Sequence, residues 1–202
     1  MSRSPRLRAG ALLGVLALGG APLAAQEQFK RPRIHALELT FAAGYFQPTA
    51  TGGELSGLPL TRKSTWAAAV KFAGYAPNGW LGAEVSGGYA PERVSQGGMG
   101  SRRTNLLFGT ARALVGRTPR RGGVSVLAGL GLSLLRRANS VLDFDRTTNH
   151  FGGSASLGVR IPIDDEVALR LDVEDLIYRA DFGSGSKLRN DFVLTAGLGI
   201  SW

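Results

Sequence analysis

The chain has 202 residues, of which 44% are hydrophobic and 19% charged, so it is long enough for one well-cored domain and is not a disordered tail. It contains no cysteine, which excludes disulfide bonds, thiolate zinc sites and lipid attachment through an N-terminal cysteine. Its formal net charge of +9 favours an anionic partner, and for an exported chain a membrane surface is the expected one.

The N-terminus predicts export. Three arginines in the first eight residues precede a charge-free apolar run from Ala9 to Gly20, and small residues follow up to Ala25. This order is typical of a secretory signal peptide, and the run is shorter than the ~20 residues that a spanning helix needs. We therefore expect a cleaved signal peptide at 1–25, a short periplasmic segment at 26–33 and the folded domain at 34–202.

The rest of the chain alternates large apolar residues with small or polar ones. In the last segment, for example, Leu194 and Leu198 alternate with Thr195 and Gly199. A period of two is typical of strands with two different faces. The expected strands cover residues 34–46, 65–75, 79–90, 104–117, 122–135, 150–163, 166–179 and 190–202.

The connections between these strands alternate in length. Those at 76–79, 118–121 and 164–165 are short and rich in turn-forming residues. Those at 47–64, 91–103, 136–149 and 180–189 are longer. Outer-membrane barrels have short turns at the periplasmic rim and longer loops at the extracellular rim, so the alternation predicts an eight-stranded antiparallel up-and-down β-barrel.

The signal peptide, the eight segments, the loop order and the terminal Trp202 resemble the small outer-membrane barrels of the OmpA and OmpX type. The resemblance covers residues 34–202 and implies a bacterial outer-membrane location. It also implies that the barrel-assembly machinery reads the last strand during biogenesis. The residues that would form this assembly signal are Phe192, Leu194, Leu198, Ile200 and Trp202.

If the apolar faces point toward lipid, the opposite faces line a narrow lumen. By strand parity the lumen collects four acids and four bases: Glu38, Lys71, Glu84, Arg112, Arg160, Arg170, Asp172 and Glu174. Buried charges need partners, and balanced signs allow a mutually satisfying network. A soluble lipid-binding barrel is the alternative, and it would place the apolar faces inside.

Aromatic and basic residues mark the expected membrane boundaries. Aromatic girdles are expected at the outer rim from Tyr45, Trp66, Tyr89, Phe151, Tyr178 and Phe192, and at the inner rim from Tyr75, Trp80 and Trp202. Guanidinium groups match phosphate geometry, so we expect contacts with lipopolysaccharide phosphates at the outer rim. The candidate residues are Arg102, Arg103, Arg136 and Arg137.

The sequence offers no convincing catalytic, cofactor or metal site. In a barrel deacylase a serine stands two residues after the histidine, but here Gly152 follows His150 at that position. Ser154 shares the face of His150 at about 13 Å, too far for a hydrogen bond. We therefore expect a monomer that is not an enzyme and does not bind nucleic acid, and that has a structural or surface-interaction role through its loops. A narrow channel for small solutes is the alternative, and a lipid-modifying enzyme has little support.

Overall fold

The computed structural model describes residues 37–49, 54–55, 58–76, 80–96, 101–117, 123–138, 147–181 and 186–202. The predicted signal peptide and periplasmic segment lie outside these residues. Within the described ranges, no helix is long and apolar enough to cross a membrane. The strands are β1 (Leu37–Pro48), β2 (Glu54–Leu55), β3 (Leu58–Lys63), β4 (Thr65–Tyr75), β5 (Leu81–Gln96), β6 (Ser101–Arg117), β7 (Ser125–Ala138), β8 (Thr148–Pro162), β9 (Val167–Asp181) and β10 (Ser186–Ser201).

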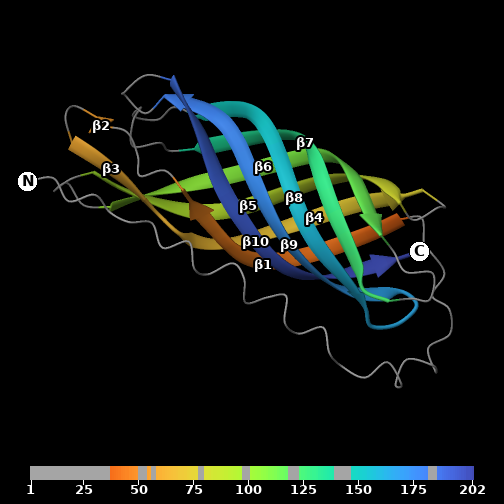
Figure 1. The fold of residues 1–202 in the computed structure, drawn as a ribbon. Coiled ribbons are helices and arrows are strands. Elements are labelled where there is room, and N and C mark those ends of the chain that lie inside the picture. The colour runs from red at the N-terminus through yellow and green to blue at the C-terminus, as the bar shows by residue number, and fades with distance from the viewer. Residues whose placement is uncertain are drawn as a thin grey trace, which may run out of the picture. The chain divides into compact units, whose positions relative to one another are not determined.

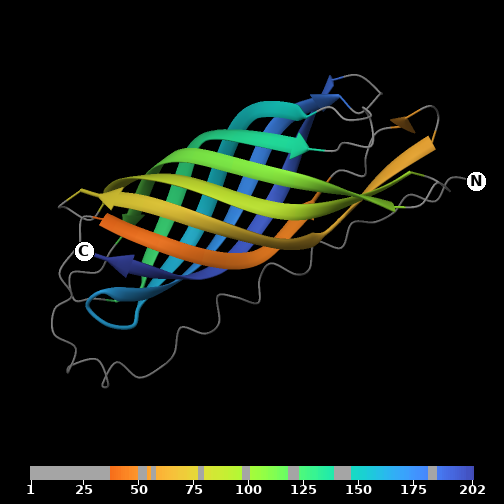
Figure 2. The same ribbon diagram turned by 180° about the vertical axis from the view of Figure 1, so that it is seen from behind.

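The long strands form a closed antiparallel barrel. From β4 to β10 each pairs with its neighbour in the chain, β1 pairs with β4, and β1 also pairs with β10. In Figures 1 and 2 the first strand (orange) and the last strand (blue) accordingly lie side by side. Backbone hydrogen bonds between Leu37 and Trp202, of 3.1 and 3.4 Å, extend this closure to the last residue. The predicted eight-stranded up-and-down barrel is confirmed.

The stagger of the strands sets the width of the barrel. Following cross-strand partners from Glu38 once around the barrel returns to β1 at Pro48, ten residues further along. Ten residues over eight strands correspond to a tilt of roughly 40°, within the usual range of barrels. A barrel of this size has an interior just wide enough for side chains to fill.

The apolar faces point outward. Leu194, Leu198 and Leu171 are 46%, 52% and 43% exposed, whereas Arg170 and Glu174 are each 2% exposed and lie inside. Such a surface suits hydrocarbon, because water would leave the large exposed residues unfavourably hydrated. The alternative of a soluble barrel with an apolar interior is therefore wrong.

A one-residue slip occurs where β3 continues β4 along β5. Lys63 pairs with Arg93 and Ala68 pairs with Tyr89, so five steps on one strand match four on the other. This is the geometry of a β-bulge, and an extra residue reverses which side chains face inward. The slip turns Arg62 toward the lumen, although uninterrupted alternation from β4 would point it outward.

Several strands extend further toward the outer rim than the sequence predicts. β5 reaches Gln96, β7 reaches Ala138 and β10 begins at Ser186. Polar residues near these ends look like loop residues in the sequence. Pairing with a neighbouring strand satisfies their backbone groups all the same, so the ladders continue.

The close approach of β1 and β10 generates a test of this closure. A Cβ atom at Gly44 would overlap the carbonyl oxygen of Leu194, whereas a Cβ at Gly87 meets no atom within 4 Å. We expect Gly44→Ala to lower the free energy of unfolding by about 2 kcal/mol relative to Gly87→Ala. Both changes restrict the unfolded chain equally, so that effect cancels. Urea unfolding in lipid vesicles measures the difference, and equal stabilities would contradict the register of β1 and β10.

Candidate functional site: the filled lumen

All eight residues of the predicted lumen network lie inside the barrel. Seven are fully buried, and the Arg160 side chain is 19% exposed. They come from six strands: β1, β4, β5, β6, β8 and β9. We call this set the inner network.

Arg170 connects three acids of the inner network. Its guanidinium lies 3.0 Å from Asp172 and 3.5 Å from Glu38, and it forms an ion pair with Glu84. These acids come from β9, β1 and β5, so one side chain bridges strands across the lumen. A planar guanidinium with five donors can serve several carboxylates at once, which an ammonium group does less well.

Of the other four members, three bases pair with these acids and Glu174 joins through Arg112. Lys71 lies 2.9 Å from Asp172. Arg112 pairs with Glu84 and reaches Glu174 at 2.7 Å. Arg160 pairs with Glu38. The eight residues therefore form one connected network with four positive and four negative charges, which is the condition for keeping them out of water.

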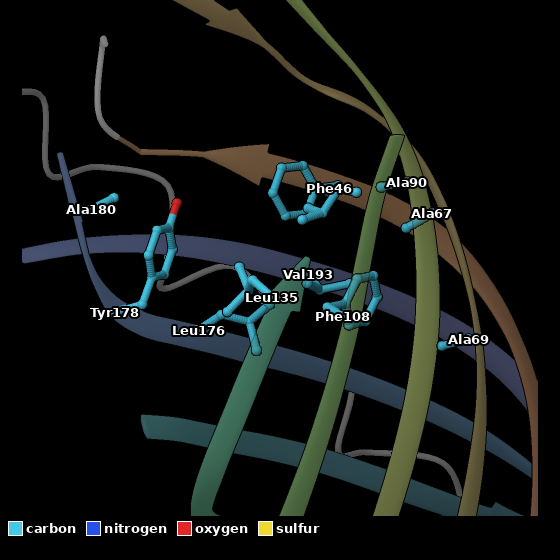
Figure 3. Packing of buried hydrophobic residues seen from close by; sticks show 11 residues of the cluster. Phe46, Ala67, Ala69, Ala90, Phe108, Leu135, Leu176, Tyr178, Ala180 and Val193 are labelled. Carbon is cyan, nitrogen blue, oxygen red and sulfur yellow. The ribbon is translucent and has the colours of Figure 1, made fainter. Parts of the chain in front are cut away.

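An apolar layer lies beyond the inner network toward the outer rim. Inward-facing residues along β7 run from Ser133 through Leu135 to Arg137, and along β10 from Thr195 through Val193 to Asp191. Figure 3 shows the side chains of this layer pointing into the space that the strands enclose. We call the layer the septum; its large members are Phe46, Leu106, Phe108, Leu135, Leu176 and Val193.

A second set of charges lies on the far side of the septum, and the sequence analysis missed it. Arg62 donates two hydrogen bonds to Asp191, at 3.0 and 2.8 Å, and pairs with Glu92. Arg137 lies 3.2 Å from Glu92 and 3.1 Å from Asp191. The Tyr178 hydroxyl donates to Asp191 at 2.7 Å. We call these five residues the outer cluster.

The outer cluster contacts the septum through Arg62, whose guanidinium carbon lies 5.9 Å from the centre of the Phe46 ring. Within the cluster, the guanidinium carbon of Arg137 lies 5.1 Å from the centre of the Tyr178 ring. Cations over aromatic faces at these distances are attracted to the rings. The lumen is thus filled in three successive layers: charged, apolar and charged.

The structure corrects one predicted lipid contact. The Arg137 side chain is only 5% exposed and faces Glu92 and Asp191, so it is not available to a phosphate outside the barrel. Arg103 and Arg136 are exposed on the outer face. Arg102 lies in β6, but its side chain is outside the described part of the chain.

The girdle prediction is wrong for two tyrosines. Tyr178 is buried in the lumen, and Tyr75 lies on the same inward face of β4 as Lys71. Tyr45, Trp66, Phe151, Trp80 and Trp202 are exposed.

The proposed assembly-signal residues lie mostly on the outer face of the last strand. Leu194, Leu198, Ile200 and Trp202 are exposed, and Phe192 is half-buried.

A simple signal in the sequence could have revealed the outer cluster. Glu92 follows Glu84 at an even spacing, and Arg137 likewise follows Ser133. Continuing the alternation past the predicted strand ends would have placed both residues inside. The bulge that turns Arg62 inward has no comparable signal.

His150 contacts the β9 backbone and the ring of Tyr178. His150 Nδ1 lies 3.1 Å from the carbonyl oxygen of Arg179, and the imidazole ring lies 5.5 Å from that of Tyr178. Among the residues that the structure describes, no group of three His, Asp or Glu side chains is arranged to hold a metal ion.

Comparisons with known proteins agree with this geometry. The family model for the outer membrane protein beta-barrel domain matches residues 11–201. Among solved structures, OprG of Pseudomonas aeruginosa is similar with a TM-score of 0.62 and 13% identity, over 86% of this chain and 99% of that one. Neisserial surface protein A also has a TM-score of 0.62, with 14% identity over 83% and 97% of the two chains.

The N-terminal barrel of OprF from Pseudomonas aeruginosa has a TM-score of 0.52 and 11% identity, over 83% of this chain and 98% of that one. No curated protein sequence matches the chain. At these identities the likeness to the solved structures concerns the fold.

The position of Arg170 predicts a large loss of stability on its removal. Arg170→Met leaves three buried acids short of a partner, so we expect the free energy of unfolding to fall by about 3–5 kcal/mol. Arg179→Met changes an exposed arginine of the same strand and is expected to cost no more than about 0.5 kcal/mol. Adding Glu84→Gln to Arg170→Met should restore part of the loss. Denaturant unfolding in vesicles provides the measurement, and a similar cost for both arginines would contradict the network.

Proposed function

This chain belongs to the outer membrane protein beta-barrel family, and we propose that it works as a sealed barrel whose functional parts are the surfaces that it presents outside. The three-layer filling of the lumen carries this proposal. A solute moving along the axis would have to separate the ion pairs of both charged sets and cross the apolar septum between them. Each of these steps is costly in a space that excludes water.

The sealed lumen predicts an absence of conductance. Purified protein inserted into planar bilayers should give no steady single-channel openings at modest voltage, because the septum and the paired charges leave no continuous water path. An open porin inserted under the same conditions serves as the positive control. Steady openings of the wild-type barrel would instead support the alternative of a narrow channel for small solutes.

We propose that the exposed arginines of the outer rim contact lipopolysaccharide. Arg103 and Arg136 support this idea by their exposure on the membrane-facing side, and Arg102 remains a candidate by its place in β6. Guanidinium groups bind phosphate through two parallel hydrogen bonds, and the outer leaflet of such bacteria is typically a phosphorylated glycolipid.

Two neighbouring arginines provide a matched test. Arg136→Gln should reduce the lipopolysaccharide that co-purifies with the barrel and change the free energy of unfolding by less than about 0.5 kcal/mol. Arg137→Gln should leave the lipid content unchanged and lower the free energy of unfolding by about 3 kcal/mol, since Glu92 and Asp191 lose a partner. Equal lipid loss in both variants would reject the proposed division of roles.

We further propose that residues 1–25 direct export and are removed, and that the last strand serves as the assembly signal. The basic, apolar and small-residue order of the N-terminus supports the first part. The alternation from Phe192 to Trp202 supports the second. The intact mass of protein extracted from outer membranes checks the cleavage site, because a chain that still carries Met1 would contradict it.

A further inference from the structure

The barrel wall carries an apolar groove on its outer face. The groove has a volume of about 630 Å³. Its rim and walls include Phe41, Ala68, Val70, Gly87, Tyr89 and Leu107, which belong to β1, β4, β5 and β6. The small residues Ala68 and Gly87 leave a depression between larger side chains, and a Cβ at Gly87 would stand in open space.

The groove has a closed floor. The Phe108 ring packs against the lumen side of Gly88, so closely that a Cβ at Gly88 would overlap it. Phe108 is buried and belongs to the septum. The groove is therefore a depression in the wall that faces hydrocarbon, separate from the lumen.

A pair of arginines lies further along two of the groove strands, β5 and β6. Arg93 and Arg103 are direct cross-strand partners in the β5–β6 ladder, and both are exposed on the outward face. Neither has an acidic partner among the residues for which the structure describes side chains. Like charges directly opposite each other destabilise a sheet, and a bound anion would remove that cost. The Cβ atoms of two directly opposed residues lie about 5 Å apart, so both guanidinium groups can bind one phosphate.

The arginine pair and the groove are aligned. Tyr89 pairs with Leu107 at the top of the groove, and the Arg93–Arg103 pair follows four residues further along each strand, at about 13 Å. Between them the Tyr89 hydroxyl donates to Asn105 Oδ1 at 2.8 Å. Going outward from the bilayer centre, the wall thus offers an apolar groove, neutral polar groups and a pair of cations.

We propose that this strip of the wall binds one lipopolysaccharide molecule, with an acyl chain in the groove and a phosphate on Arg93 and Arg103. The order of the three zones matches the acyl, sugar and phosphate parts of a phosphorylated glycolipid. This inference rests on the proposed contact between the outer rim and lipopolysaccharide. It adds a defined position, a stoichiometry of one and a role for an acyl chain.

The test uses the full mature barrel, folded in neutral detergent, with diphosphorylated lipid A as the probe and native mass spectrometry as the readout. The wild type should retain one lipid A per barrel. Gly87→Leu places a side chain in the groove at a position where its Cβ meets no protein atom within 4 Å. Arg93→Gln with Arg103→Gln removes the two guanidinium groups proposed to bind the phosphate. Each variant should weaken binding at least tenfold, and lipid A without phosphates should bind the wild type as weakly as the arginine variant binds the intact lipid.

Two controls separate these effects from general changes. Gly153→Leu makes the same change on the outer face of β8, where a Cβ has only one neighbouring atom, at 3.7 Å. Arg179→Gln with Lys187→Gln removes two exposed charges from β9 and β10. Both should bind lipid A within twofold of the wild type. Gel electrophoresis checks that each variant forms the barrel, because a folded barrel should migrate faster before boiling than the unfolded chain does after boiling.

The outcomes distinguish this inference from the proposed function. If Arg136→Gln lowers lipid binding while Gly87→Leu does not, the rim contact stands and the groove site is overturned. If lipid A does not bind the wild type at all, both are overturned. Equal binding of an anionic phospholipid would overturn the assignment to lipopolysaccharide.

Discussion

The alternation of apolar and polar residues along each strand is the constraint on which the rest of the structure depends. A closed barrel in a membrane has only an outside and a narrow inside, so the side chains that avoid lipid are confined together in the lumen. Ionisable groups confined in this way must pair, because an unpaired charge without water is strongly unfavourable. The inner network and the outer cluster are two solutions to this one requirement.

The division of the lumen into layers limits what the barrel can do. Arg170 and Arg112 hold the inner network through multiple contacts, and Arg62 and Arg137 do the same for the outer cluster. The large residues that define the septum between them are all aliphatic or phenylalanine side chains. On the proposed function, chemistry directed at other molecules is left to the outer wall and the rim.

The outer wall is not uniform around the barrel. On β7 the outward residues Leu130 and Leu132 are 72% and 73% exposed, whereas on β4 and β5 the small residues Ala68 and Gly87 leave a groove. Small residues in a lipid-facing wall sacrifice apolar contact with the bilayer, and this cost is offset if a lipid chain fits against them. In the proposed site, the Arg93–Arg103 pair further along β5 and β6 binds the headgroup of the lipid that carries this chain.

The sequence alone determined the number, order and facing of the strands, because a period of two is local and survives small errors at the strand ends. For the same reason, parity selected the eight residues that the structure brings together in the inner network. What the sequence could not give was the partner of each charge, since this depends on the ten-residue stagger that sets strands against one another around the barrel. The outer cluster depends on two further features of the tertiary structure. Arg62 turns inward only because of a bulge between β3 and β4, and Arg137 faces inward because pairing with neighbouring strands extends β7 beyond its apolar residues. Tertiary structure decided these points because register and ladder length are properties of strand pairs, not of single strands.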